Sequence, residues 1–473
     1  MALVLIALLL AQAPAAPSPA ARARYEAGLR HEKAGELASA EVAYREALRQ
    51  APRMAAAHDR LGWVLGQLGR TAEALDEFRR ATEADPKLFD AQYHLGATLW
   101  WTGDVQSALI AMRSAVALDP RHAEARYYLS LCLKGIGEQR AALAELRRAI
   151  ELNPKIPAAH LQLGVMLQQM GDAKGAVSAL REAARLDPRS KDARQNLGLA
   201  LSFGGDADEA IATLRALVAD YPEDPEPRQN LGSALLQKGD LDAAVAIYRE
   251  LVALHPDKAT AFYNLGLALK QKDDFAGAEG ALRRALEFDQ SLPDPPYTLG
   301  VVLWQTNRPD EAATALRTAI ARRPDFPEAH YLLGTIARAQ GDMDAALLAF
   351  RRAIHDQPGL AEAHMSVGQI LQRQGDAAGA AAALAEAERL TKKKTDAQAA
   401  AFAIDLGKRR LLASDVAGAL ASLREAVRLA PDLAAAHHEL ALALWRQGSR
   451  DDARTHFEAA RRLAPWLPDA PAE

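Results

Sequence analysis

The strongest constraint on the fold is a period of 34 residues that runs along most of the chain. Proline recurs at this step at Pro52, Pro86, Pro120, Pro154, Pro188, Pro222 and Pro256, and again at Pro324 and Pro358, with Gln290 in the gap. Glycine keeps the same step from Gly28 to Gly368, with Ser130 as the exception. The next step is 39 residues, to Gly407, and Ala441 then restores 34. The thirteen resulting units predict a stack of one small element rather than a set of distinct domains.

Each unit has the pattern of two amphipathic helices joined by a turn. The turn position is Gly in ten units and Asp273, Asn307 or Ser414 in the other three. A helix that ends through a left-handed residue requires Gly or a residue that tolerates this conformation. The second helix carries Ala at one position in every unit, from Ala40 to Ala453. This small residue lets neighbouring helices approach closely.

The repeated residues resemble the signature of the tetratricopeptide repeat family. The second unit has it complete, as Leu61-Gly62, Ala74, Phe78, Ala81 and Pro86. The resemblance implies an all-α fold, a right-handed α-solenoid of antiparallel helix pairs, with a concave groove lined by the first helix of each pair. The chain departs from the family at helix position 4, where an aromatic residue is usual and this sequence has His58, Gln92, Arg126, His160 and Arg194.

The repeat pattern divides the chain into six segments. We expect a signal-peptide-like segment at 1–15, a Pro-rich linker at 16–20, eleven repeats at 21–389, an irregular insertion at 390–401, two further repeats at 402–465, and a tail rich in Pro and acidic residues at 466–473. The insertion has Lys392-Lys393-Lys394 where the closing Pro should be, so we expect a kinked or loosened stack there. We also expect the final helix to expose apolar surface, because no separate polar capping helix follows it.

The amino-terminal segment predicts export. The apolar run from Ala2 to Ala11 is too short to span a membrane as a helix, and Ala13-Pro14-Ala15 suits cleavage after Ala15. No basic residue precedes the run, so an uncleaved membrane tether and a disordered apolar leader remain alternatives. We expect an exported protein, periplasmic or secreted, with a membrane-tethered or a cytoplasmic protein as the other possibilities.

Composition and motifs argue against several classes of function. The 57 Lys and Arg residues nearly balance 61 Asp and Glu, whereas nucleic-acid binders usually have a marked basic excess. The repeats occupy almost the whole chain, and no HExxH, GxSxG or Walker A pattern occurs. We therefore expect neither an enzyme nor a cofactor.

Histidine, cysteine and the acidic residues all have structural explanations. His58, His160, His330, His364 and His437 share helix position 4, one in each of five units, so we expect packing rather than metal binding. Cys132 lies between two leucines and is expected to be a small core residue. Acidic residues recur at position 2 of the first helix, where they offset the helix dipole; a ridge that selects partners with Lys or Arg is the alternative.

Aromatic residues on the first helices are the main candidates for binding. By resemblance to the family, positions 2, 5, 6, 9, 12 and 13 of the first helix face the groove. Position 5 supplies Tyr93, Tyr127, Tyr263, Tyr297 and Tyr331, and the end of the helix supplies Trp100, Trp101 and Trp304. Tyr and Trp dominate binding hot spots because they bury a large area with few rotatable bonds. For the Tyr row, packing alone is an equal alternative.

Three consecutive units place Asn at position 6, as Asn196, Asn230 and Asn264. A side-chain amide both donates and accepts hydrogen bonds, so such a row can hold an extended peptide backbone without reading its sequence. The row resembles the asparagine ladder in the repeat domain of O-linked N-acetylglucosamine transferases. The sequence therefore predicts a non-catalytic scaffold that binds extended segments of other proteins; a membrane-tethered assembly subunit of an envelope complex is the alternative.

Overall fold

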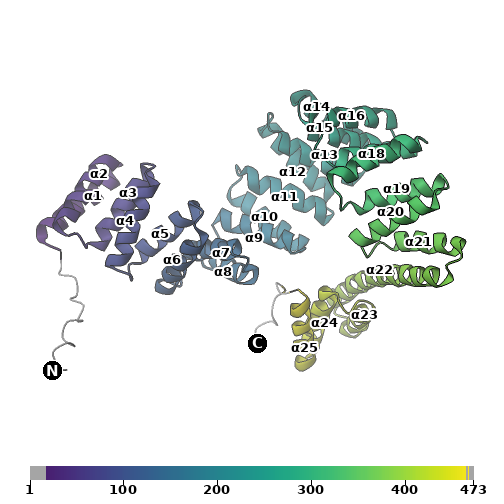
Figure 1. Cartoon of the computed structure of the whole chain (residues 1–473). Coiled ribbons are helices and arrows are strands. Elements are labelled where there is room, and N and C mark those ends of the chain that lie inside the picture. Colours follow the sequence, from purple (N-terminus) through teal and green to yellow (C-terminus); the bar gives the residue numbers. More distant parts are fainter. Residues whose placement is uncertain (1–16, 465–466, 468–473) are drawn as a thin grey trace, which may run out of the picture. The chain divides into compact units, whose positions relative to one another are not determined.

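The computed structural model describes residues 17–464 and 467, and these residues form helices and short connections (Figure 1). The chain divides into two compact units, Met1–Pro188 and Arg189–Glu473. The expected signal-like segment at 1–15 and the tail at 466–473, except Leu467, lie outside the described residues. No helix within 17–464 is both long enough and apolar enough to cross a membrane.

Each repeat contributes an A helix and then a B helix. In unit 1 they are α1 (Pro19–Lys33), α2 (Leu37–Gln50), α3 (Ala55–Gln67), α4 (Thr71–Ala84), α5 (Phe89–Trp101), α6 (Val105–Leu118), α7 (Ala123–Gly135), α8 (Gln139–Leu152), α9 (Pro157–Gln169) and α10 (Ala173–Leu186). In unit 2 they begin with α11 (Lys191–Gly204), α12 (Ala207–Asp220), α13 (Pro225–Lys238), α14 (Leu241–Leu254), α15 (Ala259–Gln271), α16 (Phe275–Phe288), α17 (Asp294–Gln305) and α18 (Pro309–Arg322). They continue with α19 (Pro327–Ala339), α20 (Met343–Asp356), α21 (Ala361–Gln374), α22 (Ala377–Leu412), α23 (Val416–Leu429), α24 (Ala434–Gln447) and α25 (Arg450–Leu463).

The turns between A and B helices confirm the predicted chemistry. Every predicted turn residue has a positive φ angle: Gly35, Gly69, Gly103, Gly137, Gly171, Gly205, Gly239, Gly341, Gly375 and Gly448, and the non-glycine residues Asp273, Asn307 and Ser414. This backbone conformation ends the A helix and lets the chain reverse into the B helix. Within each unit the resulting helix pairs stack in sequence order, which makes an all-α solenoid (Figure 1).

The recurring glycine of the A helix is required by close helix packing. In repeat 7 a Cβ on Gly232 would lie 2.4 Å from Cζ of Tyr248, which is 1% exposed on the facing B helix. The recurring alanine of the B helix, such as Ala244, is fully buried in the same contact. The repeat pattern therefore reports where the two helices of a pair touch.

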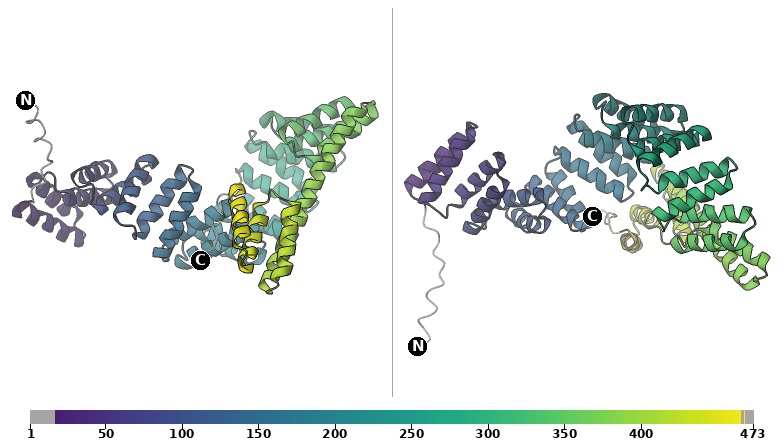
Figure 2. Two further views of the ribbon diagram at one scale, coloured as in Figure 1. Left: turned by 90° about the horizontal axis from the view of Figure 1, so that it is seen from below. Right: turned by 45° about the horizontal axis from the view of Figure 1, so that its top comes forward.

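The expected irregular insertion at 390–401 is wrong, because the segment is the middle of the 36-residue helix α22 (Figure 2). Lys392 occupies the place of the closing Pro, and neither Pro nor Gly occurs between Gly379 and Gly407. The chain therefore meets no residue that would stop a helix. The first part of α22 is the B helix of repeat 11 and its last part is the A helix of repeat 12.

Both ends of the array also differ from expectation. Helix α1 begins at Pro19, with Ser18 as its N-cap, so the expected Pro-rich linker already includes the first helical turn. The final helix, α25, buries Ala453 and Phe457 but carries Arg454 and Arg461 where α23 has apolar residues. Within the described part of the chain, Leu463 is the one large apolar residue of α25 that is exposed. The expectation that the final helix exposes an apolar surface is therefore wrong. Helix α25 itself is the polar cap.

Candidate functional site

The A helices of unit 1 carry a continuous group of aromatic rings, which we name the aromatic surface. Its members lie on α5 and α7: Phe89, Tyr93, Trp100, Trp101, Tyr127 and Tyr128. The ring centroids of Phe89 and Tyr93 are 5.9 Å apart, and those of Tyr93 and Tyr128 are 6.0 Å apart. Tyr128 also lies 6.0 Å from Trp100 and 5.4 Å from Tyr127. These contacts connect two neighbouring repeats through side chains.

Burial divides the aromatic surface into a base and one exposed ring. Tyr93, Trp100, Tyr127 and Tyr128 pack against the hydrophobic core of unit 1. Trp101 is 71% exposed; it contacts Trp100 edge-on at 5.0 Å, and its Nε1 donates to the hydroxyl of Tyr128 at 3.4 Å. The indole is thus held by neighbours while most of its surface remains in water.

Burial also sets the protonation of the tyrosines in the base. Desolvation raises the pKa of Tyr93 to about 12, with smaller contributions from Tyr128 and Glu124, and burial raises the pKa of Tyr127 as well. Both phenols therefore stay neutral over the physiological range and keep a hydroxyl that can donate a hydrogen bond.

The predicted aromatic residues of unit 2 are half-buried, like those of unit 1, but they lie in two separate clusters. Tyr263, Tyr297 and Trp304 pack against one hydrophobic cluster of unit 2, and Tyr331 packs against another. The rings of Tyr297 and Phe326 have centroids 4.7 Å apart. These residues fill space between neighbouring repeats, so the structure does not bring them into a surface like that of α5 and α7.

The three predicted asparagines differ in their hydrogen bonds. Asn196 donates from Nδ2 to the carbonyl of Asp192 at 2.8 Å, within its own helix. The side chains of Asn230 and Asn264 are half-buried and make no hydrogen bond with any residue in the described part of the chain. Next to Asn196, the buried Oε1 of Gln195 likewise has no partner there. Unit 2 therefore presents amide groups with unused hydrogen-bonding capacity.

Sequence reasoning missed several exposed apolar residues on the A helices, among them Phe402, which is 72% exposed in the last part of α22. Phe203 and Leu412 share helix position 13 with Trp101, and Met365 shares position 5 with the tyrosine row. Phe203 follows Trp101 by three steps of 34 residues, so continued counting along the repeat would have found it. Leu412 is 85% exposed and follows the 39-residue step.

The acidic residues at position 2 lie in the first turn of their helices, as predicted. Glu226 contacts the preceding repeat, at 3.4 Å from Nζ of Lys191, and Asp294 lies 3.3 Å from Arg323 at the end of its own repeat. This position suits the proposed compensation of the helix dipole. A role in selecting partners with Lys or Arg stays a prediction.

The position-4 residues have a structural role that the sequence did not indicate. Nε2 of His58 lies 2.9 Å from the carbonyl oxygen of Pro52, and His160, His330, His364 and His437 face the carbonyl six residues earlier in the same way. Gln92, Arg126 and Arg228 donate to the equivalent carbonyl. Any donor of sufficient length satisfies this loop, which explains why the aromatic residue usual in the family is dispensable here.

Metal and thiol chemistry find no support in the described residues. Within 17–464 and 467, no group of three or more His, Cys, Asp or Glu side chains is placed to hold a metal ion. Cys132 is buried in the core of unit 1, and burial raises the pKa of its thiol to about 11. A thiol in this environment is protonated and behaves as a small apolar side chain.

Similarity to solved structures is partial. MamA from Desulfovibrio magneticus RS-1 is 24% identical over 37% of this chain and 98% of that chain, with a TM-score of 0.34. YrrB, a TPR protein with an unusual peptide-binding site, is 25% identical over 37% of this chain and 91% of YrrB, with a TM-score of 0.32. The APC/C hetero-tetramer Cut9-Hcn1 is 15% identical and covers 94% of both chains, with a TM-score of 0.37. No curated protein matches the chain by sequence.

Family models are more informative. Models described as Tetratricopeptide repeat match residues 25–89, 60–121, 167–233, 230–293, 297–361, 349–395 and 404–468, which together make up more than half of the chain. The matched segments contain most of the helix pairs, with their left-handed turn residues and closely packed glycines. The chain therefore belongs to the tetratricopeptide repeat family.

Proposed function

We propose that this chain is a non-catalytic scaffold that binds extended segments of other proteins on the faces of its A helices. The observation that carries the proposal is Trp101, which is exposed on a packed aromatic base. The base holds the indole by ring contact and a hydrogen bond, so binding restricts little additional side-chain motion. Preordered Trp and Tyr side chains of this kind are typical of the residues that dominate binding energy.

The amide groups of unit 2 support the same function by another interaction. Asn230 and Asn264 share one position in consecutive repeats, so both can face one extended backbone, whose amide and carbonyl groups they can match. The side-chain amide of Asn196 already donates a hydrogen bond to the carbonyl of Asp192, so it has fewer free donors for a bound peptide. We therefore assign backbone binding to Asn230 and Asn264.

A photo-crosslinking residue at Trp101 tests the aromatic surface. The matched control is Ile110, which is 70% exposed on the B helix α6 of the same repeat. Crosslinks from position 101 should map to short, extended segments of partner proteins that position 110 does not capture. Trp101→Ala should then weaken binding of a synthetic copy of the captured segment by about 2 kcal/mol, or roughly 30-fold, with Ile110→Ala unchanged. Equal capture at both positions would contradict the proposal.

Substitution of the asparagines tests the backbone contacts. Each lost hydrogen bond costs about 0.5–1.5 kcal/mol, so Asn230→Ala with Asn264→Ala should lower affinity roughly 5- to 150-fold. Asn196→Ala is the internal control and should have a smaller effect, because its amide is already engaged. A thermal melt of each variant separates binding from packing. A double variant that melts at a lower temperature yet binds equally well would assign both residues to packing.

We also propose that the protein is exported. Support comes from the apolar run of Ala2 to Ala11 and from Ala13-Pro14-Ala15, which suits cleavage after Ala15. Mass spectrometry of the protein isolated from its host should find a mature terminus near Ala16. An intact terminus in the membrane fraction would favour the tethered assembly subunit instead, and an intact terminus on soluble cytosolic protein would contradict both.

A further inference from the structure

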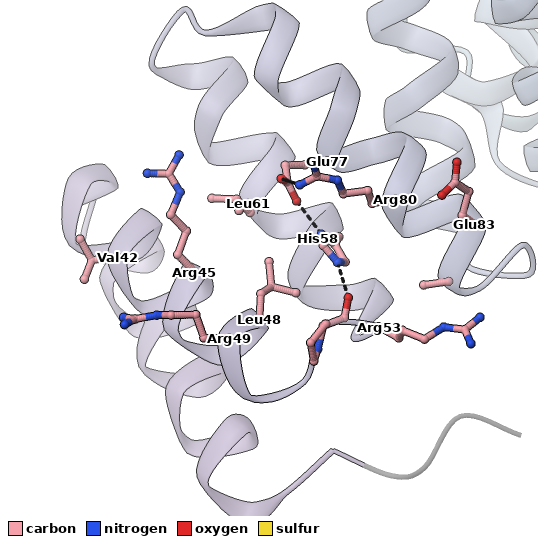
Figure 3. A pocket seen from close by; sticks show the side chains of 12 residues that line it. Val42, Arg45, Leu48, Arg49, Arg53, His58, Leu61, Glu77, Arg80 and Glu83 are labelled. Atoms are coloured by element: carbon pink, nitrogen blue, oxygen red, sulfur yellow. Dashed lines mark hydrogen bonds and ion pairs between the residues drawn. The ribbon is translucent and has the colours of Figure 1, made fainter.

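A second surface of unit 1 has the features of a binding site and uses none of the aromatic residues described above. It is a pocket of about 810 Å³ lined by residues of the B helices α2 and α4, of the loop after α2 and of α3 (Figure 3). Four arginines line it, Arg45, Arg49, Arg53 and Arg80, around an apolar floor of Leu48 and Leu61. We name it the arginine pocket.

Two of the four arginines lack a compensating acid. Arg45 pairs with Glu41 at 2.6 Å, and Arg80 pairs with Glu77 at 2.7 Å. Arg49 and Arg53 form no ion pair with any residue that the structure describes. The pocket therefore carries an excess of positive charge next to apolar side chains.

Glu77 is already fully engaged by its neighbours. One of its oxygens lies 2.5 Å from Nδ1 of His58 and the other accepts from Arg80, while Nε2 of His58 faces the carbonyl of Pro52 at 2.9 Å (Figure 3). His58 and Glu77 are both less than a tenth exposed. This network fixes the inner wall of the pocket and engages both oxygens of Glu77. Glu83, the other acid in the lining, is exposed and forms no ion pair with a described residue, so the lining has four arginines against two acids.

The arginine spacing occurs in repeat 1 and again in repeat 5, as Arg181, Arg185 and Arg189. In repeat 5 the equivalent of Arg49, Arg185, is paired with Glu182 at 2.6 Å, whereas Arg49 has no such partner among the described residues. Arg45 and Arg49 are four residues apart, which places them on one side of α2. Arg53 lies beyond the end of α2, and the loop brings it into the lining of the same pocket. The place of Arg49 is taken by Glu83 in α4 and by Glu151 in α8. A favourable interaction with the helix dipole accounts for Arg49 in the last turn of α2, but it does not account for Arg53, which lies beyond the helix.

The floor shows that a bare anion is not the best fit. Leu61 is only 2% exposed, so the apolar surface open to a ligand comes from Leu48, which is half-buried, and from Val42, which is 62% exposed. A small anion would contact the guanidinium groups and leave this apolar surface in water. A protein segment that carries Asp or Glu beside large apolar side chains satisfies both parts of the pocket.

We propose that the arginine pocket docks an acidic, apolar segment of a protein partner. This site is separate from the binding face of the A helices, so the scaffold can hold two segments of different chemistry at once. The carboxylates pair with Arg49 and Arg53, and an apolar side chain covers Leu48 and Val42.

Fluorescence anisotropy of the full chain with a short labelled peptide tests the proposal. The peptide alternates Glu with Leu and Phe, and its counterpart has Gln in place of every Glu. We expect saturable binding of the Glu peptide that weakens as salt is added, and weaker binding of the Gln peptide. Arg49→Gln with Arg53→Gln should lower affinity roughly tenfold or more. The matched control is Arg113→Gln, because Arg113 is exposed on α6 outside the pocket.

A second variant examines the apolar rim. Val42→Glu places a negative charge at an exposed position of the pocket, so it should weaken the Glu peptide while the fold is retained. Trp101→Ala should leave this binding unchanged, which separates the arginine pocket from the aromatic surface. The proposal is overturned if the Glu peptide does not saturate at millimolar concentration, if the Gln peptide binds equally, or if the arginine variant binds unchanged. Binding to vesicles with anionic lipid in preference to the peptide would also overturn it, since the occupant would then be a membrane.

Discussion

Replacement of Lys392 by Pro would restore the closing residue of the repeat at the centre of α22. In the two preceding repeats, the equivalent position is Pro358 at the end of repeat 10 and Pro324 at the end of repeat 9. Residues 391–395 of α22 are all exposed. One of these side chains, Lys393, forms an ion pair outside α22, with Asp432 of the loop between α23 and α24 at 2.8 Å. The substitution therefore acts on a helix that is surrounded by water.

The size of the effect follows from this exposure. Proline at this position removes the amide hydrogen bond to Glu388 and places its ring against that carbonyl, which costs about 3 kcal/mol in a helix interior. The hydrophobic cluster that contains Phe350 lies before the joint, and the cluster that contains Leu440 lies after it. Neither cluster loses a contact. The cost should therefore appear as local opening of α22 and leave the unfolding of each cluster little changed.

Hydrogen exchange with mass spectrometry measures this local opening. Amides of residues 389–396 should exchange up to roughly 150-fold faster in Lys392→Pro, which is the factor that corresponds to about 3 kcal/mol. Lys392→Ala is the control and should exchange like the unmodified protein, since Ala favours helix at least as well. Loss of the full 3 kcal/mol from the global unfolding of unit 2 would refute the reasoning, because the segment would then be part of a packed interface. Unchanged exchange would show that α22 is already broken at this point in solution.

Two further predictions concern the stability of unit 2. Burial lowers the pKa of His438 and of His456, so as the pH falls through about 6.5 the unfolded chain binds more protons than the folded chain. Repeats 12 and 13 should therefore lose stability between about pH 7.5 and pH 5.5. Equal melting temperatures at these two pH values would contradict this prediction. Gly232→Ala should destabilise the fold by about 1–3 kcal/mol in a denaturant titration, because the new methyl group meets Tyr248. Gly280→Ala has open space around it and should stabilise the fold by about 0.5–1 kcal/mol. Stability changes of the same sign for both variants would refute the packing argument.

The local features of the fold could be predicted from the sequence in detail. All thirteen turn residues have the left-handed conformation that their identities indicate, including Asp273, Asn307 and Ser414. The backbone dihedral angles that a residue can adopt depend mainly on its own side chain, so a left-handed turn residue can be predicted from a single position in the sequence. The period then assigns the same role to every copy.

Features that depend on several residues at once were less predictable. The missing Pro at Lys392 was interpreted as a break in the stack, although the same absence lets a helix continue through the joint. The polar end face at α25 was also missed, because Arg454 and Arg461 acquire meaning only by comparison with the apolar positions that pack on a following repeat. In both cases the local pattern left two arrangements open, and packing selected one.

The candidate sites depended most strongly on tertiary structure. Trp100 and Trp101 are neighbours of the same residue type, and the sequence treats them alike, yet Trp100 packs on the core and Trp101 is exposed. The arginine pocket left no recognisable motif, because its walls come from α2, α3 and α4 and its charge depends on which acids are already paired. Helix and turn positions were thus determined by the sequence through the conformational preferences of single residues. Exposure and charge compensation were decided by tertiary structure, because each is the sum of contacts made by several helices.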